Sequence, residues 1–279
     1  MVRDAPARAA PALDELRDRA KQIRRNVVRM ASGKGEGYIG QGLDVADILA
    51  VLFLSEMRYD PTDRGPETDR LIFSAGHYSI GLWAALAEAG HLDGFDLETY
   101  GSDGATLIMS THEGHPDLIE LTGGSLAHGL GVAAGLAVGY RLKGWPARIF
   151  CFSTDGEAQE GSTWEAAMFA GHERLGNLIN VVDVNRTQAD GDLVIEVEPL
   201  AEKYRAFGWW AADVDGNDVG ALVDVFDQAR AVTDVPKAIV CRTTLGRGVP
   251  MIVNRERNHF VRVGEDEWDE VARQLEASA

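Results

Sequence analysis

The sequence predicts an α/β fold with a mostly parallel central sheet and helices on both faces of that sheet. Three short apolar runs rich in β-branched residues are typical of buried strands: RIFCFST (148–154), NLINVVDV (177–184) and PKAIVCRTT (236–244). Segments with helical spacing lie between them, at 156–175, 198–208 and 218–231. This alternation indicates βαβ units, because two parallel neighbouring strands need a long crossover, which is usually a helix.

The region before the first of these runs predicts two helices separated by a loop. Apolar residues at helical spacing predict a helix from Pro11 to Met30. The stretch SGKGEGYIGQG (32–42) contains so many glycines that we expect a loop there. Asp44 is expected to cap an apolar helix that runs to about Met57.

The length and composition indicate one large domain over residues 1–279, because no linker, repeat or low-complexity tract divides the chain. Small residues recur near helical spacing at 123–142, which suits close helix packing inside the chain or against a partner. Cys151 and Cys241 both lie in apolar runs, so we expect buried free thiols and no disulfide framework.

The net charge limits the kinds of partner, and the apolar segments indicate the location of the chain. A formal net charge of −17 argues against a nucleic-acid partner, because proteins that bind a phosphate backbone need a basic face. The first twenty residues lack the apolar core of a signal peptide, and the run DILAVLFL is too short to cross a bilayer. We therefore expect a cytoplasmic chain with no membrane partner.

Polar side chains follow two of the predicted strands at the point where each one ends. Asp155 comes directly after RIFCFST, and Asn185 comes directly after NLINVVDV. Ligands of parallel sheets bind outside the carboxyl ends of the strands, so the two side chains converge if these strands are neighbours. One carboxylate and one amide oxygen suit a hard cation such as Mg²⁺ or Ca²⁺, with Mn²⁺ a further candidate. The alternative is structural, with Asp-Gly as a turn and Asn185 as a helix cap.

The segment from 154 to 191, TDGEAQEGSTWEAAMFAGHERLGNLINVVDVNRTQADG, resembles the thiamine-diphosphate signature of transketolases. The resemblance is long, and it implies that the chain binds thiamine diphosphate together with a divalent metal. Asp155 and Asn185 match the side-chain ligands of the metal in that family. The carbonyl of Thr187 matches its backbone ligand.

The same resemblance implies two loops around the cofactor. Gly156 and Glu157 match the loop beside the diphosphate. The segment LTGGSLAHGL (121–130) is similar to the family's segment around the aminopyrimidine ring, which implies cofactor contacts from Gly124, Ser125 and Leu126.

Three histidines lie in segments that resemble catalytic or binding segments of the family. His77 in FSAGH matches a histidine beside the diphosphate and the substrate channel, so it is expected to bind the cofactor as well. His115 in EGHPD matches a histidine that reaches the donor substrate, and His259 in RNHFV lies where the family often has another.

Two positions depart from the residues that the family usually has, and a third matches a family residue near a contact between active sites. Tyr38 in EGYIGQGL stands where the family has a histidine that binds donor hydroxyls. Tyrosine, whose ordinary pKa is about 10, is no proton shuttle at neutral pH, so we expect a different donor preference or proton path and a specialised pathway. Thr154 replaces a usual glycine without removing a ligand, and Glu160 matches an acidic residue near the contact between paired active sites.

The resemblance covers nearly the whole chain but only the N-terminal domain of a transketolase. It implies transfer of a two-carbon ketol unit from a ketose, expected to be phosphorylated, to an aldose. The glutamate that activates the cofactor lies on a pyrimidine-binding domain in this family, so we expect a separate C-terminal subunit to supply it in an α₂β₂ assembly.

Two other functions stay open. The α subunit of a 2-oxo-acid dehydrogenase shares the pattern from Asp-Gly to Asn, although GHPD, TGGSLAHGL and QEG favour a transketolase. A non-catalytic subunit that keeps the cofactor pocket is the other alternative, and Tyr38 and Thr154 are the residues that favour it.

Overall fold

A five-stranded parallel sheet forms the centre of the computed structural model, which describes residues 11–114, 116, 118–189 and 191–278. The order of the strands across the sheet is β2, β3, β4, β8, β7, and each neighbouring pair is parallel. Their bounds are Arg70–Phe73 (β2), Ile149–Thr154 (β3), Leu178–Val184 (β4), Trp210–Asp215 (β7) and Lys237–Arg242 (β8). The predicted fold class is confirmed.

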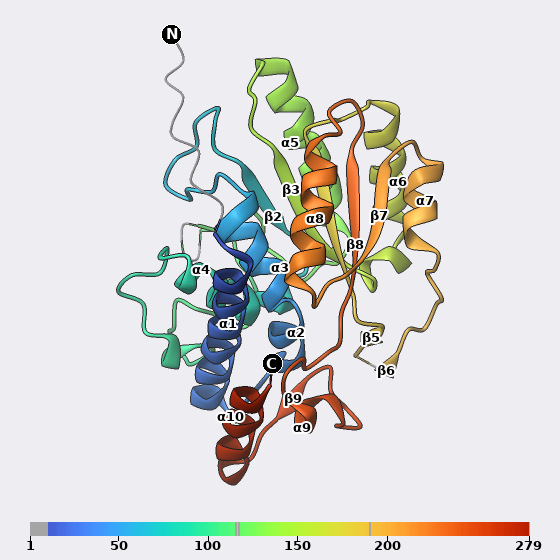
Figure 1. Ribbon diagram of the computed structural model, residues 1–279. Coiled ribbons are helices and arrows are strands. Elements are labelled where there is room, and N and C mark those ends of the chain that lie inside the picture. The colour runs from blue at the N-terminus through green and yellow to red at the C-terminus, as the bar shows by residue number, and fades with distance from the viewer. Residues whose placement is uncertain (1–10, 115, 117, 190, 279) are drawn as a thin grey trace.

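Helices cover both faces of this sheet (Figure 1). One face packs against α1 (Leu13–Lys34), α3 (Ala46–Val51), α4 (Ser79–Glu88) and α8 (Val219–Arg230). The other face packs against α5 (His128–Lys143), α6 (Gly161–His172) and α7 (Leu200–Ala206). The alternation of side chains along a strand divides the core, so Phe150 and Phe152 of β3 join the first layer while Ile149 and Cys151 join the second.

The segment at 32–42 is mostly helical, so the predicted loop is wrong. Helix α1 continues to Lys34 and ends at Gly35, whose φ of 81° is the left-handed geometry that glycine adopts without strain. Strand β1 (Glu36–Gly37) pairs with β9 (Val261–Arg262), and helix α2 (Ile39–Asp44) follows it. The glycines inside these helices serve close packing, since a Cβ at Gly33 would lie 2.4 Å from the carbonyl oxygen of Glu98.

Asp44 does not cap the following helix, which corrects a second prediction. It is the last residue of α2, it is fully buried, and its carboxylate accepts a hydrogen bond of 2.9 Å from Asn185 Nδ2. Helix α3 continues into a π-helical turn, Leu52–Glu56, close to the predicted end of the helix at Met57. Asp218 is a true cap of α8, because its carboxylate accepts from the backbone N–H of Gly220 at 2.8 Å.

The remaining elements flank the sheet. They are the hairpin of β5 (Thr187–Gln188) and β6 (Gly191–Asp192), the helices α9 (Pro250–Val253) and α10 (Trp268–Ala277), and short 3-10 turns at Gly76–Tyr78, Leu97–Thr99, Glu157–Gln159 and Glu265–Glu267. Helix α10 lies against α1, where Arg25 Nε and Glu276 Oε1 are 2.6 Å apart.

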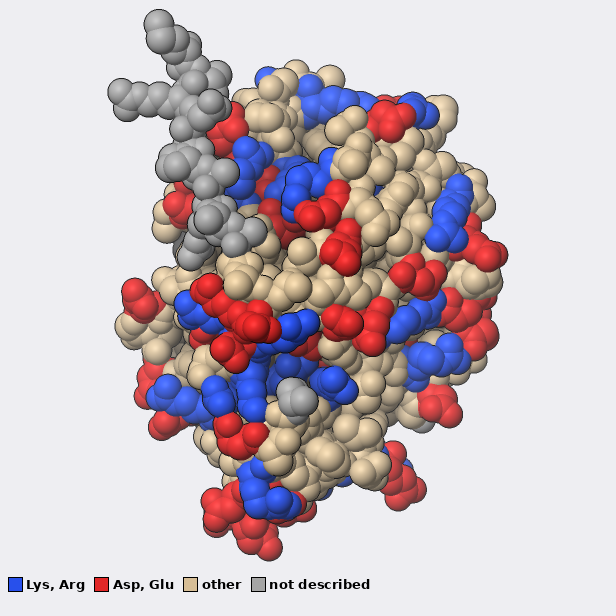
Figure 2. All heavy atoms as spheres, in the orientation of Figure 1, with Lys and Arg blue, Asp and Glu red and all other residues tan. Residues whose placement is uncertain are grey.

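Charged side chains of both signs lie on the surface, and the two cysteines lie in the core. Acidic and basic side chains intermingle on the face drawn in Figure 2. Several ion pairs are exposed, such as Arg17–Asp14 at 2.8 Å. Cys151 and Cys241 are buried and free, as predicted. Within the described residues, no helix has the length and apolar character that crossing a membrane requires.

The packing of α1 leads to a matched pair of variants. Gly33→Ala should lower the free energy of unfolding by roughly 1 to 3 kcal/mol, because the new methyl group meets backbone that cannot rotate away. Gly131→Ala, on a part of α5 where an added Cβ has no neighbour within 4 Å, should raise it by up to about 1 kcal/mol. Urea unfolding measures both, and equal stabilisation by the two substitutions would refute the close contact at Gly33.

Candidate active site

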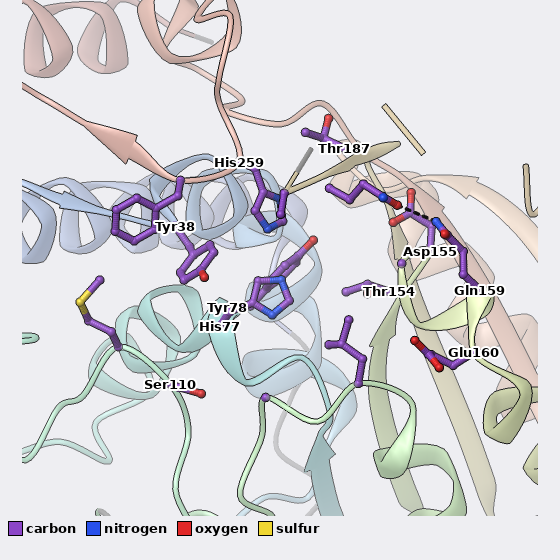
Figure 3. Close-up of a pocket in the computed structure, with 17 residues that line it drawn as sticks. Tyr38, His77, Tyr78, Ser110, Thr154, Asp155, Gln159, Glu160, Thr187 and His259 are labelled. Atoms are coloured by element: carbon purple, nitrogen blue, oxygen red, sulfur yellow. Dashed lines mark hydrogen bonds between the residues drawn. The ribbon is translucent and has the colours of Figure 1, made fainter. Parts of the chain in front are cut away.

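A cavity of about 680 Å³ opens at the carboxyl ends of β3 and β4 (Figure 3). Tyr38 and two histidines, His77 and His259, lie on one side of it, and Asp155 and Thr187 lie on the other. Among the described residues, no lysine or arginine lines this cavity. An anionic ligand placed here would therefore need a cation that the lining side chains do not supply.

The pairing of β3 with β4 brings Asp155 and Asn185 to neighbouring strand ends. Thr154 is opposite Asp183 in the register, and the N–H of Asp155 extends the ladder by donating to the carbonyl oxygen of Asp183 at 2.9 Å. The backbone N–H of Arg186 donates to Asp155 Oδ2 at 2.7 Å. Asp155 is 2% exposed, and burial raises the pKa of its carboxyl to about 6.

The amide of Asn185 has a fixed orientation. Its Nδ2 lies 2.9 Å from Asp44 Oδ2, 2.9 Å from the hydroxyl of Tyr78 and 3.1 Å from Asp183 Oδ2. Its Oδ1 accepts from the backbone N–H of Thr187 at 3.0 Å. Because carboxylates only accept hydrogen bonds, the nitrogen must face them and the oxygen must face the other way.

A buried acidic group surrounds this amide. It consists of Asp44, Asp155 and Asp183, which are 0%, 2% and 0% exposed. Burial is the main cause that raises the pKa of the carboxyls of Asp44 and Asp183 above the usual range, although hydrogen bonds to Asp183 from Tyr78 at 2.9 Å and Thr243 at 2.5 Å oppose it. Among the described atoms, Asp44 Oδ1 is buried without a hydrogen-bond partner. Burial disfavours the charged forms of these carboxyls, so a proton or a cation close to them would stabilise the folded chain.

The donor set fits a metal whose remaining ligands come from a second molecule. In the described part of the chain, no group of three or more His, Cys, Asp or Glu side chains could hold a metal alone. A carboxylate, an amide oxygen and a backbone carbonyl leave coordination positions for phosphate oxygens and water, which is how Mg²⁺ is usually bound.

Glu157 holds three segments of the site together. Its buried carboxylate accepts from the N–H of Ala127 at 2.7 Å, from the N–H of Thr154 at 3.0 Å and from the hydroxyl of Ser74. Burial raises the pKa of its carboxyl. Glu157 does not line the cavity, whereas its neighbour Gly156 does.

The second predicted cofactor loop lies at the cavity in part. Gly124 and Leu126 line the cavity, and Gly124 has a φ of 109°. Ser125 is exposed outside the lining, with its Oγ 3.5 Å from His128 Nε2.

The histidines form an aromatic group with Tyr38. The ring centroid of Tyr38 lies 5.0 Å from that of His77 and 5.5 Å from that of His259, and the two imidazoles are 5.6 Å apart (Figure 3). Burial and the neighbouring His259 lower the pKa of His77 to about 3, and burial lowers that of His259. Both rings are therefore neutral at pH 7. His115 lies outside the described residues.

Three functional candidates were missed in the sequence: Asp44, Tyr78 and Asp183. The available signal was weak but real, because Asp183 is a charged residue within the apolar run NLINVVDV and Asp44 begins an apolar segment. A charged residue in a buried segment destabilises the fold unless it has a partner or a ligand.

The acidic group makes stability depend on pH in the metal-free chain. Asp155 titrates near pH 6 when folded and near 4 when unfolded, so protonation favours the folded state as pH falls from 7.5 to 5. We expect the free energy of unfolding to rise by roughly 1 to 3 kcal/mol over that interval. Asp155→Asn should reduce the slope of the profile and leave the part that Asp44 and Asp183 contribute, as urea titrations at several pH values would measure; an unchanged slope would contradict this account.

Comparisons with known proteins agree on one family. The family model described as transketolase, thiamine diphosphate binding domain, matches residues 16–278. An uncharacterized transketolase family protein of Sinorhizobium fredii, y4mO, is 47% identical over 94% of this chain and 95% of its own length.

Two further relatives are named as subunits of transketolases. The 6-deoxy-6-sulfo-D-fructose transketolase subunit SqwG of Clostridium sp. is 34% identical over 94% of this chain and 96% of its own length. An apulose-4-phosphate transketolase subunit of Actinobacillus succinogenes is 36% identical over 91% of this chain and 93% of its own length.

Solved structures show the same fold. The transketolase of Campylobacter jejuni superposes with a TM-score of 0.85 and 26% identity, and that of Leishmania mexicana with 0.83 and 26%. Each match covers 96% of this chain, but only 44% and 42% of the two enzymes, so the chain spans less than half of a solved transketolase.

Proposed function

Since this chain belongs to the transketolase family through its thiamine-diphosphate-binding domain, we propose that it is the cofactor-binding subunit of a two-subunit transketolase. The observation that carries the proposal is the pair of adjacent strand ends. Asp155 lines a cavity whose described lining has no lysine or arginine, and the buried Asn185 lies at the neighbouring strand end, two residues before Thr187 of the same lining. The family match favours this function over the α subunit of a 2-oxo-acid dehydrogenase. We treat residues 1–279 as one cofactor-binding domain in the cytoplasm.

The proposed metal site consists of Asp155, the amide oxygen of Asn185 and the carbonyl of Thr187. Mg²⁺ is the ion we expect, and Ca²⁺ or Mn²⁺ would meet the same oxygen ligands. Gly156 lines the cavity, where it can bring backbone close to the diphosphate. When bound, thiamine diphosphate supplies the carbonyl-addition chemistry, and the protein positions it.

Glu157, Gly124, Ser125 and Leu126 have different parts in this proposal. Gly124 and Leu126 line the cavity and contact the cofactor, while Glu157 supports the loops through Ser74, Ala127 and Thr154. Ser125 is exposed and faces His128, so we assign it to the rim.

His77, His115 and His259 are the proposed groups for substrate oxygens and cofactor phosphate. His77 and His259 line the cavity as neutral imidazoles, so each can donate one hydrogen bond and accept another. Tyr38 lies against both rings and can donate from its hydroxyl.

The proposed reaction moves a two-carbon ketol unit from a ketose to an aldose. Two relatives are named for ketoses that carry an anionic group, a sulfonate in one and a phosphate in the other. With no lysine or arginine among the described cavity residues, we assign recognition of that group to the partner. Tyr38, where the family has a histidine, supports a specialised pathway.

The partner is proposed to be a C-terminal transketolase subunit with the pyrimidine-binding domain, in an α₂β₂ assembly. The surface that we assign to it is formed by α5 and α6. On α5, added Cβ atoms at Gly131, Gly135 and Gly139 would meet nothing within 4 Å, and on α6 Met168 and Phe169 are 54% and 47% exposed. Glu160 directly precedes α6 and lines the cavity, so this surface continues to the active site.

Removing the carboxylate of Asp155 tests the cofactor site. Asp155→Ala should abolish Mg²⁺-dependent binding of thiamine diphosphate in titration calorimetry, because the metal loses its charged ligand. Asp224→Ala, at an exposed position of α8, should bind like the unmodified chain. Tight binding by Asp155→Ala would remove the basis of the proposal.

A bulky side chain on α5 tests the partner surface and the dependence of activity on the partner. Gly135→Trp should fold, since its surroundings are open, but should bind the C-terminal subunit at least about tenfold more weakly. Ketol transfer should need both chains and should fall with the loss of complex, as sedimentation and coupled assays would measure. Asp224→Trp, on the opposite face of the sheet, is the matched control. Full activity of the isolated chain would overturn the two-subunit function.

A further inference from the structure

Gln41 lies directly behind a histidine of the cavity. It is part of α2, it is fully buried, and its Nε2 lies 2.9 Å from the backbone oxygen of His259 and 3.0 Å from Nδ1 of the same residue. His259 itself lines the cavity (Figure 3). The contact joins positions 218 residues apart in the sequence.

Two glycines bring the segments together. A Cβ at Gly40 would lie 2.8 Å from Leu245 Cγ and 3.3 Å from the carbonyl oxygen of Asn258. A Cβ at Gly42 would lie 2.8 Å from Ile80 Cγ2. Glycine at these positions lets α2 pack closely against α4 and the 258–259 segment, and Gln41 between them reaches the histidine.

The orientation of the Gln41 amide follows from the backbone oxygen of His259. A carbonyl oxygen only accepts hydrogen bonds, so the amide nitrogen must face it, and the flipped amide would place two oxygens 2.9 Å apart. The same nitrogen then donates to Nδ1. Nδ1 must carry a lone pair, and in a neutral imidazole the proton is therefore on Nε2.

The contact between Gln41 and His259 leaves a buried polar atom without a partner, which indicates a role for Gln41 beyond packing. Gln41 Oε1 is buried and has no hydrogen-bond partner among the described atoms, which destabilises the folded chain. A leucine or methionine would fill the same space without that cost.

We propose that Gln41 is a positioning residue that holds His259 as the Nε2–H tautomer, so that the ring presents a hydrogen-bond donor to an oxygen of the bound ligand. Within the proposed function, His259 then stabilises oxygen atoms of cofactor or substrate and cannot accept a proton at Nε2. The tautomer itself stands independently of that function.

The test reads the tautomer directly in the full chain without cofactor. With ¹⁵N-labelled histidine, and His259→Phe to assign the signals, Nε2 should show the shift of a protonated nitrogen and Nδ1 that of an unprotonated one. Gln41→Met removes the donor at similar size and should move both signals towards intermediate values. Gln22→Met on α1, whose Nε2 contacts Asn26 at 3.3 Å, should leave them unchanged.

Each outcome decides the proposal. A proton on Nδ1 in the unmodified chain, or an unchanged spectrum in Gln41→Met, would overturn it. The spectrum of the unmodified chain suffices if the variant does not fold. Failure of thiamine diphosphate binding would instead count against the proposed function, because the tautomer is measured without any ligand.

Discussion

The parallel pairing of β3 with β4 is the constraint on which the site depends. The backbone N–H of Asp155 donates to the carbonyl oxygen of Asp183, one hydrogen bond beyond the last paired residues of the two strands. This bond fixes where the segments after β3 and β4 leave the sheet. The side chains of Asp155 and Asn185 then emerge at the same edge from segments that the crossover helix α6 connects. A shift of the register by one residue would reverse the faces of β4 and move Asp183 out of the buried acidic group.

The central architecture could be predicted because its strands are buried on both faces. Such strands are continuous apolar runs, and four of the five sheet strands, all except β7, have that form. Strand β7 was missed because it lies at an edge of the sheet, where Asp213 and Asp215 alternate with apolar residues in a half-exposed pattern. Local propensity also misled at 32–42, since the packing of α1 and α2 against distant segments decides the conformation there.

Some residues of the site could be predicted from the local sequence, whereas others depend on contacts between distant segments. Asp155, Gly156 and Asn185 follow predicted strands, so their placement at the strand ends is a local property. The contacts of Asn185 with Asp44 and Tyr78 span 141 and 107 residues, and that of Gln41 with His259 spans 218. No spacing rule predicts such contacts, because they arise only when helices from the start of the chain pack on the sheet.

The buried acidic group has a consequence for the lifetime of the chain in a cell. Burial of three carboxyl groups weakens the folded state, and a ligand that binds only this state raises its stability by mass action. Small changes in stability alter the fraction of a protein that proteases remove. If the proposed cation binds beside this group, the fraction of chains that survive proteolysis depends on the supply of that cation.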